Sequence, residues 1–183
     1  MLTIELPDGY LHRHERMALE RGSSLGGGYL LPVTVVDDRG QTKLIYRTEG
    51  YVSFAEYNFH GDLYRVFRAL KSYVRKIYEA QDMLLSAERI FRSPAMVFVS
   101  AADQGVRVVY GEQGARESAH SAYGQALVPM LAKLSEKKSV TGAKPAMEQL
   151  AAKIRTANPG YEGALRVIEA VERRWNYTQP VGL

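Results

Sequence analysis

The stretch that decides the fold is YEAQDMLLSAERIFRSPAMVFVSAADQGVRVVYG, residues Tyr78–Gly111. It begins with the end of a helix and continues through a turn. It then contains two apolar runs, Met96–Val99 and Val106–Tyr110, on either side of the polar loop Ala101–Gly105. Nearly continuous apolar runs of this kind are typical of strands buried on both faces or against helices. We therefore predict a buried β-hairpin here.

The segment before this hairpin, Asp62–Gln81, carries the clearest helical pattern of the chain. Apolar residues recur along it at spacings of three and four: Leu63, Val66, Phe67, Leu70, Val74, Ile77 and Tyr78. That spacing places them on one face of an α-helix, and the Arg and Lys residues lie mostly away from it. We predict that this is the central core helix and that the hairpin packs on it.

The N-terminal part of the chain predicts a strand, a helix and a further hairpin. Leu2–Leu6 alternates apolar and polar residues, as a half-buried strand does. Leu11–Arg21 is rich in helix-forming residues, and the glycines and serines of Gly22–Gly28 are expected to end that helix. Leu30–Val36 and Gln41–Arg47 are β-rich runs joined by an acidic turn with a late glycine, which favours a hairpin. One face of the helix would gather Leu11, Glu15, Ala18 and Leu19.

The C-terminal third predicts three helices. The first spans about residues 117–134, and Pro129 predicts a kink or a break within it. A polar linker, Ser135–Lys144, separates it from the helices Met147–Arg155 and Tyr161–Trp175. The chain therefore changes from mixed to purely helical structure along its length.

The length of 183 residues fits one domain. We expect residues 1–175 to form a single α+β domain, with two β-hairpins packed on a central helix and a helical C-terminal half. We expect residues 176–183 to form a flexible tail. The chain has no cysteine, which excludes disulfides, thiolate zinc sites and a cysteine nucleophile. It shows no signal peptide, and no uncharged apolar run reaches the roughly 18 residues expected of a membrane helix, so we expect a soluble, cytoplasmic protein.

The net charge of +4 comes entirely from one segment. Residues 132–174 hold nine cations and five acids, while the rest of the chain holds fifteen of each. A basic helical face here could meet an acidic protein partner, nucleic acid or an anionic membrane, or could be an ordinary solvated surface. The candidate interaction face consists of Lys133, Lys137, Lys138, Lys144, Lys153, Arg155, Arg166, Arg173 and Arg174.

Sites for chemistry are sparse in this sequence. Histidines 12, 14, 60 and 120 do not have a metal-binding spacing, and Gly26–Gly28 lacks the Lys-Ser/Thr that completes a phosphate-binding loop. No GxSxG motif is present. Tyrosines interleaved with basic residues, such as Tyr64 and Tyr73, could stack on nucleic-acid bases, but no RNA-binding motif accompanies them. We therefore expect no catalytic residues, no metal and no cofactor, and nucleic acid is not the expected partner.

Two groups of residues carry a resemblance to a known family. The first is the helix–glycine–hairpin succession His12–Arg21, Tyr29–Pro32 and Lys43–Tyr46, and the second is Leu84–Ile90, Ser93–Val99 and Val106–Tyr110. Over about residues 10–135 the chain resembles the uncharacterised domain found at the N-terminus of bacterial proteins with a C-terminal forkhead-associated domain. It is similar, more distantly, to the cytoplasmic pseudokinase domain of the membrane-anchored subunit of type VII secretion systems. The resemblance implies a degenerate protein-kinase-like fold.

The kinase comparison can be made position by position. A kinase catalytic loop places an acid three residues before a proline or similar residue, an Asn two residues after it, and a metal-binding Asp at the end of the next strand. Anchored on Pro94, these positions hold Phe91, Met96 and Val109. Such side chains can neither accept a proton nor bind magnesium.

We therefore predict a non-catalytic interaction or scaffolding domain of a bacterial signalling or secretion-associated protein. The expected partner is a protein, and a membrane-associated complex is compatible with it. One alternative is a nucleotide-binding domain or weak enzyme with an unrecognised site. A second is a nucleic-acid-binding module that uses the basic C-terminal helices.

Overall fold

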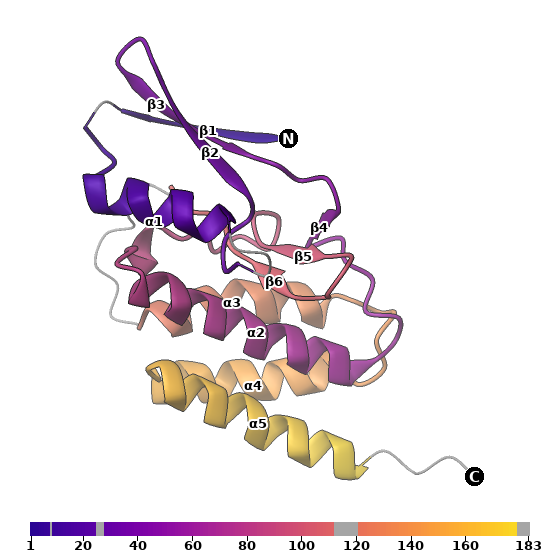
Figure 1. Ribbon diagram of the computed structural model, residues 1–183. Coiled ribbons are helices and arrows are strands. Elements are labelled where there is room, and N and C mark those ends of the chain that lie inside the picture. Colours follow the sequence, from indigo (N-terminus) through magenta and orange to yellow (C-terminus); the bar gives the residue numbers. More distant parts are fainter. Residues whose placement is uncertain (8, 25–27, 112–120, 179–183) are drawn as a thin grey trace.

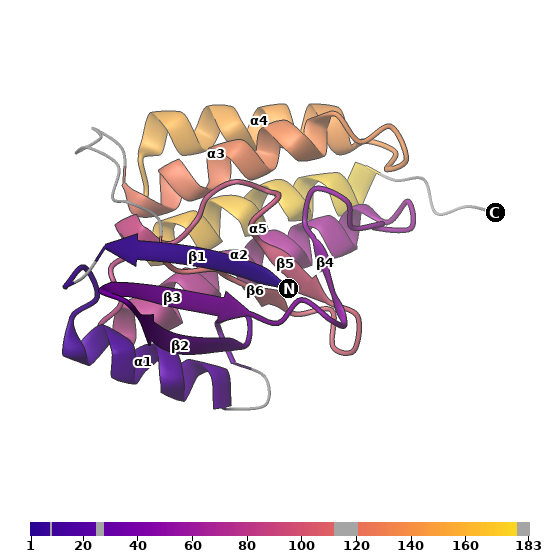
Figure 2. The same ribbon diagram turned by 90° about the horizontal axis from the view of Figure 1, so that it is seen from above.

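A computed structural model describes residues 1–7, 9–24, 28–111 and 121–178. The described chain is α+β, as predicted, and is arranged in layers (Figure 1). A small sheet and one helix form the N-terminal end, a second sheet lies beside the central helix, and a pair of helices forms the opposite end (Figures 1 and 2). One hydrophobic core runs through all of these parts.

The N-terminal sheet contains the predicted hairpin and the predicted first strand. Its antiparallel strands β1 (Leu2–Pro7), β2 (Val33–Asp38) and β3 (Gln41–Tyr46) are ordered β1-β3-β2. Alternate residues of the central strand, Thr42, Leu44 and Tyr46, are buried, which is the period-two pattern of a strand with one face in the core. The helix α1 (Arg13–Ser24) packs against β2 (Figure 2).

This helix ends within the predicted glycine- and serine-rich segment Gly22–Gly28. It continues through Gly22 to Ser24, three residues beyond the predicted helical run Leu11–Arg21. A β-carbon at Gly22 would lie 2.8 Å from the hydroxyl oxygen of Tyr29, which donates to the carbonyl of Ala18 at 3.1 Å. The glycine is therefore explained by the close approach of a buried tyrosine to the helix, not by chain reversal.

The second sheet contains the predicted buried hairpin as its central part. Its strands β4 (Tyr51–Ser53), β5 (Phe98–Ser100) and β6 (Val106–Arg107) are antiparallel in the order β4-β5-β6. The hairpin strands are shorter than predicted, because the residues after β6 leave it to make separate bridges. Val108 pairs with Leu30 in parallel, and Tyr110 pairs with Ile90 in antiparallel. This run therefore connects three parts of the chain.

The helix α2 (Leu63–Asp82) is central, as predicted, and its apolar stripe is buried. It is capped by Asp62, whose side chain accepts from the Tyr64 amide at 2.8 Å. The short 3₁₀ helix η1 (Ala87–Arg89) follows it. The layer beyond it contains α3 (Ala122–Ser135), α4 (Ala143–Ala157) and α5 (Tyr161–Thr178), with α5 returning to pack on α2.

Two features of these helices bear on the sequence prediction. Pro129 lies inside α3 without breaking it, so the predicted break is absent, and the alternative of a kink stays a prediction. Helix α4 begins at Ala143, earlier than the predicted Met147. The predicted start of α3 near residue 117 lies outside the described residues. Helix α5 includes residues 176–178, residues 179–183 lie outside the described chain, and the flexible tail stays a prediction. No helix in the described ranges combines the length and apolarity needed to cross a membrane.

Candidate functional site

The three positions that a kinase would use for chemistry are part of the packing. Val109 is fully buried, and its carbonyl accepts from the Phe91 amide at 2.9 Å. Phe91 and Met96 are half-buried and pack against the core. Each side chain is therefore explained by its apolar contacts. A kinase-like fold is not confirmed by this arrangement and stays a prediction.

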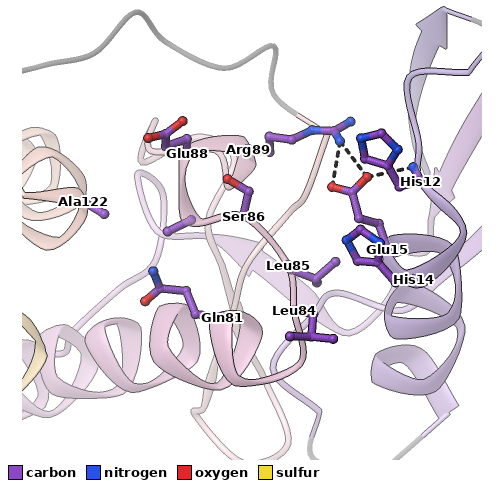
Figure 3. Close-up of a pocket in the computed structure, with 11 residues that line it drawn as sticks. His12, His14, Glu15, Gln81, Leu84, Leu85, Ser86, Glu88, Arg89 and Ala122 are labelled. Atoms are coloured by element: carbon purple, nitrogen blue, oxygen red, sulfur yellow. Dashed lines mark hydrogen bonds and ion pairs between the residues drawn. The ribbon is translucent and has the colours of Figure 1, made fainter.

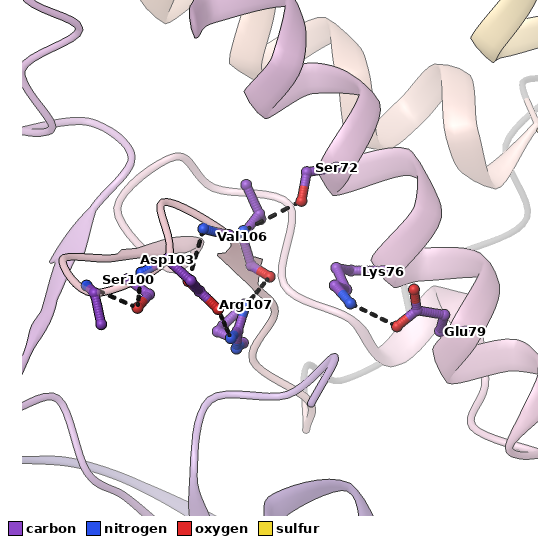
Figure 4. Close-up of polar contacts among 9 residues, drawn as sticks. Ser72, Lys76, Glu79, Ser100, Asp103, Val106 and Arg107 are labelled. Atoms are coloured by element: carbon purple, nitrogen blue, oxygen red, sulfur yellow. Dashed lines mark hydrogen bonds and ion pairs between the residues drawn. The ribbon is translucent and has the colours of Figure 1, made fainter. Parts of the chain in front are cut away.

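The polar loop of the buried hairpin is closed by its own side chains (Figure 4). Asp103 accepts from the Gly105 amide at 2.8 Å and from Arg107 Nη2 at 2.7 Å. The Ser72 hydroxyl of α2 accepts from the Val106 amide at 3.2 Å. Burial raises the pKa of Asp103, but the hydrogen bonds that its carboxylate accepts from Gly105 and Arg107 outweigh burial and lower that pKa to about 2. The carboxylate is thus ionised and committed to the turn.

A buried ion pair joins α1 to η1 (Figure 3). Arg89 Nη1 donates to both carboxylate oxygens of Glu15, at 2.7 and 2.9 Å, and their side chains are only 11% and 4% exposed. The same carboxylate accepts from the His12 amide at 2.8 Å and from the Tyr110 hydroxyl. Burial raises the pKa of Glu15, but hydrogen bonds from Tyr110, His12 and Arg89 outweigh it and hold the pKa below its ordinary value.

The guanidinium of Arg89 also lies between two aromatic rings. Its central carbon is 4.1 Å from the ring centroid of Tyr10 and 5.1 Å from that of Tyr110. Nε and Nη2 of Arg89 are buried without a hydrogen-bond partner. Cation–π contact is their compensation in this environment.

A hydroxyl completes the connection to the N-terminal sheet. Tyr46 of β3 is fully buried, and its hydroxyl donates to the Tyr110 carbonyl at 2.8 Å while accepting from the Tyr110 amide at 3.1 Å. Burial raises the pKa of Tyr46 well above its ordinary value, so this hydroxyl stays protonated. The side chain thus satisfies both backbone groups of one residue, as a neighbouring strand would.

A broad hollow of about 890 Å³ lies beside this ion pair (Figure 3). His12 and His14 line it with their imidazole rings stacked at 5.7 Å between centroids. A general base needs a free acceptor, and both oxygens of Glu15 are already occupied. Across the described ranges, no three histidine or carboxylate side chains gather closely enough to hold a metal ion. The arrangement is chemically suited to holding elements together.

The nine cations predicted as an interaction face are divided by the structure among α3, the turn after it, α4 and α5. Lys133 and Lys137 are half-buried. Lys137 donates to the Tyr57 carbonyl at 2.8 Å and lies 5.5 Å from the ring centroid of Phe59, and burial lowers its pKa. The other seven are exposed: Lys138, Lys144, Lys153, Arg155, Arg166, Arg173 and Arg174.

Comparison with known proteins finds limited similarity. No family model and no curated protein matches the sequence. Among solved structures, the crystal structure of the cytoplasmic fragment of EssB from Staphylococcus aureus is similar, with a TM-score of 0.41 and 11% sequence identity. The match covers 93% of this chain and 92% of the EssB chain. Similarity at this level does not establish a common fold.

The resemblance to the pseudokinase domain of the type VII secretion subunit stays a prediction. The association with forkhead-associated domains stays a prediction.

The sequence prediction missed the polar cluster around Arg89. One signal for it was present, because Glu15 was placed on the apolar face of its helix, where a carboxylate requires a partner. Nothing in the sequence pointed to Arg89 or Tyr110 as that partner. They follow Glu15 by 74 and 95 positions.

Proposed function

We propose that this chain is a non-catalytic interaction domain that docks an acidic protein segment through the outer surface of α4 and α5. It would serve as a scaffold in a bacterial signalling or secretion-associated protein, and its location would be cytoplasmic. The carboxylates of the buried Glu15 and the half-exposed Asp103 support the non-catalytic part, because both are saturated by structural hydrogen bonds.

The observation that carries the proposal is the charge on the outer helix pair. Figure 1 shows α4 and α5 at the end of the molecule opposite the N-terminal sheet. Their inner faces bury apolar residues such as Leu150 and Ile168, and Glu172 is bound at 2.7 Å to Lys71 of α2. The remaining charged residues of the two helices are six exposed cations and three acids: Lys144, Lys153, Arg155, Arg166, Arg173, Arg174, Glu148, Glu162 and Glu169.

The mixture of signs favours a protein over a polyanion as partner. Arg166 lies 4.0 Å from Glu162 on the same helix, so the surface is not uniformly positive. Nucleic acid binds best where cations follow the phosphates without intervening acids. A protein segment with a matching pattern of carboxylates gains from both signs.

The test is a charge-reversal variant, Lys153→Glu/Arg155→Glu/Arg166→Glu, used as bait in extract of the source organism. Quantitative mass spectrometry should show at least one acidic protein whose recovery falls about tenfold or more relative to the unchanged chain. That loss should be mimicked by raising the salt concentration, since exposed charges are screened.

A matched control reverses three exposed cations of the N-terminal part, Arg13→Glu/Arg39→Glu/Arg47→Glu. It changes the net charge by the same amount on a different surface, so recovery of the partner should persist. Equal losses from both variants would show a non-specific charge effect and would refute the docking surface. A saturable thermal stabilisation by ATP with magnesium would refute the non-catalytic, non-nucleotide assignment.

A further inference from the structure

The end of α2 is a helix-capping motif with an unusual residue. The Leu85 amide donates to the Ala80 carbonyl and the Leu84 amide to the Gln81 carbonyl, both at 2.9 Å. These are the two hydrogen bonds of a Schellman motif, in which the residue after the cap is left-handed and is usually glycine. Here it is Leu84, with a φ of 65°.

The backbone of Leu84 is strained in this conformation, and burial of its side chain does not compensate for the strain. Its side chain is 70% exposed, whereas its neighbour Leu85 is buried. Among the described non-glycine residues with positive φ, the others are polar or charged: Arg39, His60, Gln104 and Asn158. A strained backbone with an exposed apolar side chain is unfavourable for the isolated fold, and such outliers suggest a function outside it.

Leu84 lies between two adjoining hollows. One is the hollow beside the Arg89 ion pair, and the other, of about 250 Å³, is lined by Met17 of α1 and Met83. Met17 is itself 44% exposed. Figure 3 shows Leu84 between the end of α2 and α1, next to His14, which lines both hollows. An apolar side chain therefore projects next to an apolar recess of suitable size.

The walls of the second hollow carry opposite charges. Arg21 of α1 and Asp82 at the end of α2 both line it. A surface that carries a cation and an acid at separate positions can be complementary to itself after a two-fold rotation. A two-fold interface between identical copies has this property, because the cation of each copy then meets the acid of the other copy.

We propose that this surface is a self-association interface, in which Leu84 of each copy enters the Met17–Met83 hollow of the other. Arg21 of each copy then faces Asp82 of its partner copy. The surface involves none of the basic residues of α4 and α5 on which the docking proposal rests, so either proposal can fail without the other. The role of Leu84 is to contact the second copy, which accounts for an exposed leucine where the helix end favours glycine.

The first test is sedimentation equilibrium of the full chain over a wide range of protein concentration, with thermal unfolding measured in parallel. The unchanged chain should show a reversible dimer. Leu84→Gly should weaken that dimer tenfold or more. At a concentration where the variant is monomeric, its folding equilibrium constant should be about fivefold higher than that of the unchanged chain, because glycine relieves the left-handed strain. An unchanged chain that stays monomeric, or a dimer unaffected by Leu84→Gly, would overturn the proposal.

A charge swap provides the second test. Arg21→Asp and Asp82→Arg should each be monomeric alone, because each places like charges opposite one another across the two-fold axis. Mixing the two variants should restore a dimer, since one contact then pairs Asp at position 21 with Arg at position 82 and the other pairs the native Arg21 with the native Asp82. Circular dichroism of each variant checks that it is folded. Failure of two folded variants to associate when mixed would rule out the two-fold arrangement.

Discussion

Arg89 Nη1 donates to both carboxylate oxygens of Glu15, at 2.7 and 2.9 Å, across a sequence separation of 74 residues. The pair connects α1 with the 3₁₀ helix that follows α2, and the Tyr110 hydroxyl joins it from the segment after β6. Three distant segments therefore meet at one buried charge pair. Its arrangement explains why Glu15 occupies the apolar face of α1.

Replacing Arg89 should strongly destabilise the fold. Arg89→Met leaves the Glu15 carboxylate buried without a cation, and an uncompensated buried charge costs about 3–5 kcal/mol. Urea unfolding should show a loss of that order. The double variant Glu15→Gln/Arg89→Met removes both charges and should recover a large part of the loss. A double variant less stable than Arg89→Met would contradict the assignment.

The Tyr46 hydroxyl should be worth more than an ordinary tyrosine hydroxyl. Tyr46→Phe removes the partner of both the amide and the carbonyl of Tyr110 in a fully buried place. Unsatisfied buried groups cost about 1–3 kcal/mol, so chemical denaturation should show a decrease in that range. Tyr51→Phe is the control, since Tyr51 is half-buried, and it should change stability by less than about 0.5 kcal/mol. Equal effects would show that the Tyr46 hydroxyl has no special role.

Asp103 should make stability depend on acid pH. Its pKa is about 2 in the folded chain, below the ordinary 3.8, so the folded state favours the carboxylate. The contribution is fully present above about pH 4 and is lost as the pH falls towards 2. Because its side chain is half exposed, solvent screening limits it to on the order of 1 kcal/mol. Asp103→Asn should therefore be less stable than the unchanged chain at pH 6 but nearly equal to it at pH 2. A gap independent of pH would exclude this origin.

Two adjacent lysines should behave differently. Lys137 donates to the Tyr57 carbonyl and lies against Phe59, whereas Lys138 is exposed. Lys137→Met keeps the aliphatic stem but removes the hydrogen bond, and should cost about 1–2 kcal/mol in thermal or urea unfolding. Lys138→Met should stay within about 0.5 kcal/mol of the unchanged chain. If Lys137→Met leaves the free energy of unfolding unchanged, the Lys137 hydrogen bond does not stabilise the fold.

Much of the fold could be predicted because its signals are local. The apolar stripe of α2, the alternation in β1 and the turn that joins β2 to β3 each depend on residues a few positions apart. Helical and extended periodicities express which face each element buries. The excess of cations on α4 and α5 could also be predicted from composition, although the exposure of their side chains could not.

Other features could not be predicted because they depend on distant segments. Gly22 lies inside α1, and the reason for a glycine there is Tyr29, whose ring packs against it. The second strand of the buried hairpin is short because Val108 and Tyr110 pair with Leu30 and Ile90 instead of continuing the pairing with β5. Leu84 gave no sign of a left-handed conformation, because leucine rarely adopts one.

The amino-acid sequence by itself determined the α+β class, the central helix, the buried hairpin and the excess of cations near the C-terminus. Local propensity and the period of apolar residues are sufficient for these. Only the tertiary structure decided that Glu15 and Arg89 share a buried site, that Lys137 is committed to the fold while Lys138 is not, and that Leu84 projects from a strained turn. These depend on which segments become neighbours when the core closes, and no local pattern encodes the identity of a partner 74 residues away.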